Sequence, residues 1–361
     1  MQFVNNPKYV ARLTSTDQQN CMNQPKSMNV QKPRDKQKPI NQSKPVNMNE
    51  LLLINKPTFM NQSKSMKKID LLSSKKHGFI RPDECDACFV HNYSYILDNE
   101  DICSTDGNKN VSHILILITS TPENSERRAA IRDTWLSPSR ENTADVRYAF
   151  LVGMTSDMIL QKKLEMEYLS NRDLIQEDFV DSYYNLTLKT LMAFKWASTK
   201  CKEAKYFFKT DDDMFVNLDA LKEIIKKNER ILQKSIAGRC DLNRKPIRNI
   251  ASKWYISYEN YPHKQYPIHC SGTGYVTSMN IVNKVYKISR NIPFIFLEDI
   301  FVSLCIRKLG LNMTNLEGFN TGLVKPGCIY KTKEVVTSHR VSPELLRKIW
   351  NECFHEAKIK A

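Results

Sequence analysis

Three consecutive aspartates, Asp211, Asp212 and Asp213, stand between two apolar segments, residues 206–208 and 214–216. The first apolar segment has the composition of a buried strand, and carboxylates at alternate positions of an extended chain point to the same side. We therefore expect Asp211 and Asp213 to act together on one ligand. Open sets of carboxylate oxygens suit Mg²⁺ or Mn²⁺, which proteins commonly share with substrate phosphates. A solvated acidic turn is the alternative, and the apolar flanks favour the metal site.

Two further candidates for chemistry lie downstream. Glu298 and Asp299 follow the apolar run 293–297, and an acidic pair in this position either caps a helix or supplies a general base. His339 ends a predicted strand. It becomes a ligand of the same ion only if the fold brings it to Asp213.

Residues 269–275 read HCSGTGY and contain two glycines separated by one residue. Such glycines allow the backbone to approach a ligand closely. No Gly-Lys-Ser/Thr follows, so the segment is not a phosphate-binding loop.

The elements that must hold these residues alternate along the chain. Apolar runs predict strands at 114–118, 146–152 and 206–209, and amphipathic or capped segments predict helices at 127–135, 156–169, 186–201, 217–233 and 343–358. Strands separated by helices predict an α/β fold with a mainly parallel sheet. Ligands of such sheets bind beyond the carboxyl ends of the strands, which is where the acidic triplet stands.

The positive charge of the chain lies mostly away from these motifs. The 361 residues carry a formal net charge of +15, but residues 1–80 alone hold 14 Lys and Arg against four Asp and Glu. Variants of one short polar unit recur there at 22–28, 40–46 and 60–66, which predicts a disordered basic tail. The tail has no aromatic interleaving and no nucleic-acid motif, so we expect no nucleic-acid partner.

The cysteines point to an oxidising compartment. Cys85 and Cys88 form a C-x-x-C, which is half a zinc site or a redox pair, but no second C-x-x-C exists among the ten cysteines. Disulfides between scattered cysteines fit better. Acceptor sequons for N-glycosylation occur as well, among them the one at Asn185. No apolar run has the length of a signal peptide or membrane span, because the longest, 114–118, is strand-sized.

Eight motifs, in order, resemble those of the β-1,3-galactosyltransferase family, and the resemblance runs from about residue 114 to 351. They are RAAIRDTW at 128–135, FLVG at 150–153, EDFVDSYYNLTLKT at 177–190, KTDDDMFVN at 209–217, SKWY at 252–255, YPIHCSGTGY at 266–275, EDIFVSLC with RKLG at 298–310, and HRVSP at 339–343.

The resemblance implies a GT-A-like αβα nucleotide-sugar-binding domain over 111–361, preceded by a cysteine-containing connecting segment at 81–110 and a stem-like tail at 1–80. Members of the family transfer galactose, or in sister groups N-acetylglucosamine, from a UDP-sugar to the 3-hydroxyl of an acceptor sugar, with inversion. We therefore expect UDP-galactose as donor, a glycan of a glycoprotein or glycolipid as acceptor, and Mn²⁺ as cofactor. The family also implies the Golgi lumen and membrane association, although no anchor is visible in this sequence.

The roles of individual residues follow from the same resemblance. Asp213 and His339 correspond to metal ligands, and Asp211 and Asp212 lie near the ribose of the donor. Asp299 corresponds to the catalytic base. Four further residues have implied roles: Arg128 and Arg132 in the donor pocket, and Trp254 and Glu298 on the acceptor side. Asn185 matches a glycosylation site typical of the family.

Two alternatives remain at this point. The alternatives to a β-1,3-galactosyltransferase are a β-1,3-N-acetylglucosaminyltransferase that uses UDP-N-acetylglucosamine and a non-catalytic sugar-binding relative. The intact triplet, together with Asp299 and His339, argues against a non-catalytic protein, which has no need of all of them.

Overall fold

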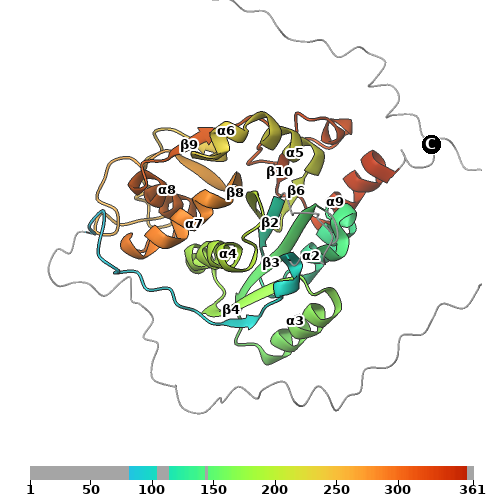
Figure 1. Ribbon diagram of the computed structural model, residues 1–361, viewed down its shortest axis with the longest axis horizontal. Coiled ribbons are helices and arrows are strands. Elements are labelled where there is room, and N and C mark those ends of the chain that lie inside the picture. Colours follow the sequence, from blue (N-terminus) through green and yellow to red (C-terminus); the bar gives the residue numbers. More distant parts are fainter. Residues whose placement is uncertain (1–80, 104–113, 143–144, 356–361) are drawn as a thin grey trace, which may run out of the picture. The chain divides into compact units, whose positions relative to one another are not determined.

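The computed structural model describes residues 81–103, 114–142 and 145–355, which Figure 1 draws as coloured ribbon. These residues belong to one compact unit, Ile80–Ala361. The predicted tail, residues 1–80, lies outside the described residues.

An eight-stranded sheet forms the centre of the unit. Its order is β1 (Tyr95–Leu97), β4 (Leu174–Val180), β3 (Val146–Met154), β2 (Ile114–Thr119), β5 (Tyr206–Asp211), β8 (His269–Ser278), β7 (Ser235–Asp241) and β9 (Asn312–Asn315). Strands β4, β3, β2 and β5 run parallel, β9 runs parallel to β7, and β8 runs antiparallel to both of its neighbours. The expected α/β class with a mainly parallel sheet is therefore confirmed.

Helices cover both faces of the sheet, because its central strands are apolar on both sides. Leu115 and Leu117 of β2 belong to one core, and Ile116 and Ile118 belong to the other. The first core receives α4 (Leu186–Lys200), α7 (Met279–Ile288) and α8 (Glu298–Lys308), which lie on one side of the sheet in Figure 1. The second receives α2 (Ser125–Asp133), α3 (Met158–Asn171), α5 (Leu218–Lys227), α6 (Glu229–Leu232) and α9 (Pro343–Trp350).

A second, two-stranded sheet stands beside the main one and matters for the site. It pairs β6 (Met214–Val216) with β10 (Thr337–His339) in antiparallel orientation, and His339 is the register partner of Met214. Short 3₁₀ segments lie at Glu100–Cys103, Ser137–Asn142, Tyr183–Asn185, Ser289–Asn291 and Cys328–Lys331, and a π-helical turn lies at Asn351–His355.

Helix starts follow the capping residues that the sequence offers. Asn217 accepts a hydrogen bond from the backbone N–H of Ala220 and starts α5, and Ser342 does the same for Leu345 at the start of α9. Both caps agree with the sequence prediction. The last helix was predicted to reach residue 358, but α9 ends at Trp350, where a π-helical turn replaces it.

Disulfides tie the unit together, as predicted. Three of them join Cys85 to Cys88, Cys103 to Cys201, and Cys240 to Cys270, and Cys328 is also disulfide-bonded. The C-x-x-C at Cys85 and Cys88 is thus a disulfide and not half of a zinc site.

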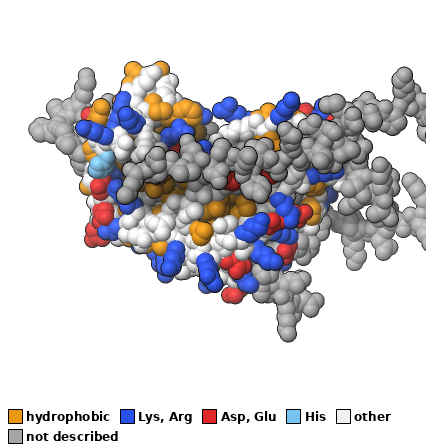
Figure 2. Space-filling view, turned by 90° about the horizontal axis from the view of Figure 1, so that it is seen from above, with side chains coloured by type: hydrophobic (Ala, Val, Ile, Leu, Met, Phe, Trp, Pro, Cys, Tyr) orange, Lys and Arg blue, Asp and Glu red, His pale blue; other side chains and the backbone are white. Residues whose placement is uncertain are grey.

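The surface of the unit mixes charge and apolar groups. On the face in Figure 2, Lys and Arg side chains are interspersed with Asp and Glu and with hydrophobic side chains. Within the described residues, no helix is both long enough and apolar enough to cross a membrane.

Candidate active site

The acidic triplet forms the turn between β5 and β6, at the carboxyl edge of the parallel strands. Asp211 ends β5 and accepts hydrogen bonds from the Thr119 hydroxyl and from Lys209 Nζ, the latter at 2.7 Å. Asp212 and Asp213 lie in the turn, so the alternation expected of an extended segment stops at Asp211. As a result, each of the three carboxylates has its own set of partners.

Asp212 is held by the loop that follows the neighbouring strand, β2. Ser120 Oγ and Asn124 Nδ2 donate hydrogen bonds to Asp212 Oδ2 at 2.7 and 2.9 Å. Burial raises the pKa of Asp212, and these two donors oppose the shift. Arg127 Nη1 lies 3.9 Å from carboxylate oxygens of both Asp212 and Asp213. Sequence analysis missed Ser120 and Arg127, although Ser120 stands only two residues after the predicted strand 114–118.

Asp213 meets His339, which joins it from a distant part of the chain. The imidazole Nε2 of His339 lies 3.2 Å from Asp213 Oδ2, and Nδ1 lies 3.0 Å from the carbonyl oxygen of Thr321. The hydrogen bond to Asp213 raises the pKa of His339. Burial by itself would raise the pKa of Asp213, but His339 outweighs it and the net shift is downward. Both side chains are partly exposed, at 26% for Asp213 and 20% for His339.

Asp213 and His339 together fit a divalent cation that is shared with a substrate. Within the described residues, no group of three or more His, Cys, Asp or Glu side chains could hold a metal ion. Two protein ligands suffice where substrate phosphates and water complete the coordination, as is common for Mg²⁺ and Mn²⁺ sites. The Thr321 carbonyl fixes the orientation of the His339 ring, which leaves Nε2 facing Asp213.

The second acidic pair begins α8. Leu297 is the N-cap residue and its side chain makes no capping hydrogen bond, so neither acid occupies the N-cap position itself. Asp299 accepts a hydrogen bond from the backbone N–H of Ile300 in the first turn at 2.8 Å, so it also serves the helix start. Burial raises the pKa of Asp299, and it raises that of Glu298 to about 7. A carboxylate with a raised pKa is suited to accept a proton near neutral pH.

The paired glycines of residues 269–275 lie inside strand β8, not in a loop around a ligand. A Cβ atom added at Gly272 would lie 1.9 Å from Glu298 Oε1, so the absent side chain makes room for that carboxylate. Lys209 Nζ donates to the Gly272 carbonyl oxygen and lies 3.3 Å from Glu298 Oε1. At Gly272 the close neighbour is therefore the protein's own carboxylate, and the approach of a ligand to these glycines stays a prediction.

Arg128 and Arg132 lie below the loop after β2 and face Glu167 of α3. Arg128 is fully buried and forms an ion pair with Glu167 at 2.6 Å, while Arg132 pairs with Glu167 and with Asp173 at 2.7 and 2.8 Å. Arg128 also donates to Ser120 Oγ at 2.9 Å. The contact of Arg128 with the acidic triplet is thus indirect and passes through Ser120.

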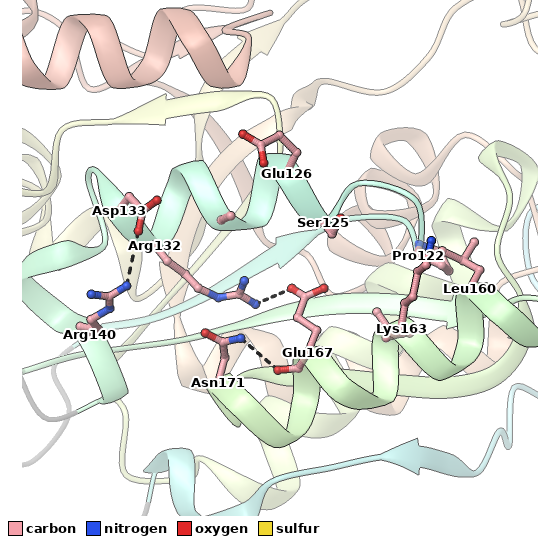
Figure 3. Close-up of a pocket in the computed structure, with 12 residues that line it drawn as sticks. Pro122, Ser125, Glu126, Arg132, Asp133, Arg140, Leu160, Lys163, Glu167 and Asn171 are labelled. Atoms are coloured by element: carbon pink, nitrogen blue, oxygen red, sulfur yellow. Dashed lines mark hydrogen bonds and ion pairs between the residues drawn. The ribbon is translucent and has the colours of Figure 1, made fainter. Parts of the chain in front are cut away.

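A cavity of about 490 Å³ lies between α2 and α3, and Figure 3 shows the side chains around it. Arg132 and Glu167 point toward each other across this cavity, and Arg140 pairs with Asp133 at its edge. Neither the acidic triplet nor the residues of α8 line it. The cavity is therefore separate from the candidate active site.

Exposed rings lie beside Asp299. Trp254 and Tyr183 are 46% and 38% exposed, and Lys253 Nζ lies 4.8 and 5.2 Å from the centres of their rings. We call Tyr183, Lys253 and Trp254 the aromatic surface cluster. Burial and the charge of Asp299 raise the pKa of Tyr183 to about 12, which places this cluster next to the acidic pair. Sequence analysis identified Trp254 but not its two partners.

Asn185, the predicted glycosylation site, stands at the start of α4. Its side-chain amide donates a hydrogen bond to the carbonyl oxygen of Val180 at 2.8 Å. The exposed Tyr184 precedes it directly.

A second cavity, of about 470 Å³, adjoins the loop that orients His339. Arg239 of β7 and residues 319–324 line it, Thr321 among them. The Thr321 carbonyl contacts the His339 ring, so this cavity opens beside the proposed metal ligands.

Comparisons with known proteins show which family this chain is similar to. A galactosyltransferase family model matches residues 126–317, which include the acidic triplet and the Glu298–Asp299 pair. The chain is 38% identical over 264 residues to beta-1,3-galactosyltransferase 1 of Mus musculus and of Homo sapiens, over 73% of this chain and 79% of each relative. It is 37% identical over 250 residues to beta-1,3-galactosyltransferase 5 of Homo sapiens, over 68% of this chain and 80% of the relative.

Among solved structures, one titled galactosyltransferase LgtC in complex with donor and acceptor sugar analogs is matched at a TM-score of 0.37 and 9% identity. The match covers 68% of this chain and all of that chain. A likeness this weak supports no conclusion about the present chain.

Proposed function

This chain belongs to the galactosyltransferase family, and we propose that it transfers galactose from UDP-galactose to the 3-hydroxyl of an acceptor sugar, with inversion. The acceptor we propose is a terminal N-acetylhexosamine of a glycoprotein or glycolipid. One observation carries the proposal: the acidic triplet, whose Asp213 pairs with His339, and the Glu298–Asp299 pair meet at the carboxyl end of β5, where Lys209 bridges Asp211 and Glu298. In such a site, Asp213 and His339 would serve the diphosphate of the donor, and Asp299 would serve the hydroxyl of the acceptor.

Asp299 is proposed as the general base. An acceptor hydroxyl is a weak nucleophile at neutral pH, and a carboxylate that removes its proton contributes about 10²- to 10⁴-fold to the rate. Burial raises the pKa of Asp299, which favours this role. Inversion follows when the hydroxyl attacks directly from the face opposite the leaving UDP, so no second carboxylate nucleophile is needed.

Asp213 and His339 are proposed to hold Mn²⁺. When bound, the ion would stabilise the negative charge that develops on the leaving diphosphate. The neighbouring Arg127, 3.9 Å from Asp213, offers further positive charge on the same side of the site. Asp211 and Asp212 are proposed to position the ribose of the donor, with Arg128 and Arg132 supporting the loop behind Asp212.

The acceptor is proposed to lie on the aromatic surface cluster. Exposed rings provide flat apolar surfaces, and Trp254 and Tyr183 stand beside Asp299. Glu298, which is buried at the same helix start, belongs to the acceptor side of the site in this proposal.

The disulfides support an oxidising compartment, and we propose the Golgi lumen with association to its membrane. Asn185 is proposed as a glycosylation site in that compartment. No nucleic-acid partner is proposed.

A transfer assay tests the proposed function. The full chain is incubated with Mn²⁺ and either UDP-galactose or UDP-N-acetylglucosamine, against a panel of sugar acceptors, and the product linkage is determined. We expect galactose on a 3-hydroxyl. Transfer from UDP-N-acetylglucosamine alone would identify the sister activity, and UDP binding without transfer from either donor would indicate a non-catalytic relative.

A further inference from the structure

Lys209 is a fully buried lysine in the middle of the candidate site. It lies on β5, two residues before Asp211, and its side chain is only 2% exposed. A buried ammonium group is costly unless charged or polar partners surround it. The partners of Lys209 therefore indicate why the chain has a lysine inside an otherwise apolar strand.

Three elements supply those partners. Lys209 Nζ donates to Asp211 Oδ1 at 2.7 Å on its own strand, to the Gly272 carbonyl oxygen on β8, and lies 3.3 Å from Glu298 Oε1 on α8. Burial alone would lower the pKa of Lys209, but Asp211 and Glu298 outweigh it and keep the amine protonated. One cation thus connects the donor side of the site with the acidic pair at the start of α8.

The surroundings of Glu298 leave its carboxylate little freedom. A Cβ atom at position 272 would meet it at 1.9 Å, and Thr190 Oγ1 on α4 donates to its second oxygen at 3.3 Å. The carboxylate is therefore held between α4, β5 and β8. Its sequence neighbour Asp299 is fixed by the same helix start.

We propose that Lys209 is a positioning residue for the transfer reaction, which holds Glu298 and thereby sets the placement of the base Asp299. This inference rests on the proposed function, in which Asp299 removes the acceptor proton. Lys209 touches neither Asp213 nor His339, so its role concerns the base and not metal binding.

The charged groups that face Asp299 determine how the loss of Lys209 changes the pKa of Asp299. Burial opposes ionisation of Asp299, whereas the neighbouring His269 and Lys209 favour it. Removal of the Lys209 charge should make Asp299 hold its proton more tightly. The other titratable groups around Asp299 are Glu298 on the same helix, Tyr275 on β8, and Tyr183 and Tyr266.

Lys209→Met tests the proposal in the full chain. We expect kcat to fall by about 10²-fold, because a misplaced base costs this much. The acidic limb of the kcat–pH profile should move up by roughly one pH unit, since an opposite charge at this range shifts a pKa by that order. Because Lys209 also holds Asp211 on the donor side, the affinity for UDP with Mn²⁺, measured by calorimetry, should fall by a smaller factor than kcat. An unchanged kcat or an unmoved acidic limb overturns the proposal.

Lys195→Met is the matched control. Lys195 is also a largely buried lysine that pairs with a glutamate, Glu177, at 2.7 Å, but it is not part of the site. This variant should lower the melting temperature and leave the pH profile in place. If Lys209→Met does not fold, Lys209→Arg replaces it: the charge is kept, so kcat should fall while the acidic limb stays. A Lys209→Arg enzyme with wild-type kcat overturns the proposal.

A stability cycle separates failure of this inference from failure of the proposed function. Lys209→Met and Glu298→Gln are made singly and together, and unfolding is followed by denaturant. We expect Lys209→Met to lower the free energy of unfolding much less in the Glu298→Gln background than in the wild-type chain. In that background Lys209 has already lost one of its two charged partners. If the two substitutions change the free energy of unfolding additively, the inference is overturned, whatever the transfer activity of the variants. If the two substitutions are non-additive but the wild-type chain transfers no sugar, the result counts against the proposed function and not against this inference.

Discussion

The imidazole Nε2 of His339 lies 3.2 Å from Oδ2 of Asp213, although the two residues are far apart in the chain. Strand pairing brings them together, because β10 aligns His339 with Met214, the residue that follows Asp213. The backbone N–H of Val341 also donates to the Asp213 carbonyl oxygen at 2.9 Å. The proposed metal site is therefore built by the small second sheet.

Asp213→Ala is expected to abolish the Mn²⁺-dependent part of UDP binding. The variant removes one of two protein ligands, and the remaining His339 cannot hold the ion alone. Calorimetric titration with UDP, with and without Mn²⁺, measures the effect. Asp219→Ala, an exposed acid in the first turn of α5, serves as control and should bind normally. Unchanged Mn²⁺-dependent affinity in Asp213→Ala would exclude the residue as a ligand.

Asp299→Asn is expected to lower kcat by about 10²- to 10⁴-fold, the usual contribution of a general base. The amide keeps the size of the side chain but cannot accept the acceptor proton. UDP affinity with Mn²⁺ should stay at the wild-type value, since Asp299 lies on the acceptor side. Near-normal turnover in this variant would remove Asp299 from the role.

The kcat of the wild-type chain is expected to fall on the acidic side at a pH above the ordinary aspartate value of 3.8. The base must be ionised to act, and burial raises its pKa, so protonation and loss of activity begin at a higher pH than for an exposed aspartate. The measurement is kcat against pH at saturating donor and Mn²⁺. UDP affinity over the same range serves as control. Activity that stays constant down to the ordinary aspartate range contradicts this assignment.

Gly272→Ala is expected to lower both stability and activity. The new Cβ would lie 1.9 Å from Glu298 Oε1, and the carboxylate must move. Insertion of a group into a filled space typically costs about 1–3 kcal/mol of unfolding free energy. Gly322→Ala is the matched control for stability, because nothing lies within 4 Å of its added Cβ. Equal unfolding free energies for the two variants would contradict the crowding seen at Gly272.

Arg128→Met is expected to cost about 3–5 kcal/mol of unfolding free energy, because it leaves Glu167 without one partner of a buried ion pair. Arg140→Met is the control: the Arg140–Asp133 pair is exposed, and such pairs contribute less than about 1 kcal/mol. Denaturant unfolding measures both. Loss of donor affinity in Arg128→Met without loss of stability would show a direct role in donor binding instead.

The sequence alone identified the chemistry-bearing residues that stand in runs. The acidic triplet after an apolar strand, the Glu298–Asp299 pair and the caps at Asn217 and Ser342 are all local patterns, and local patterns follow from strand and helix periodicity. Strands β2, β3 and β5 were predicted for the same reason. By contrast, no strand was predicted at β8, because its glycines and polar residues break the apolar pattern that marks the other central strands.

Only the tertiary structure decided which of these residues meet. His339 reaches Asp213 because β10 pairs with β6, and Lys209 reaches Glu298 because α8 packs across β5 and β8. Arg128 matched a donor-pocket motif, but the fold buries it against Glu167. Spacing along a chain reports which face of an element is buried. It does not report the order of strands in a sheet, and that order sets the contacts between distant side chains.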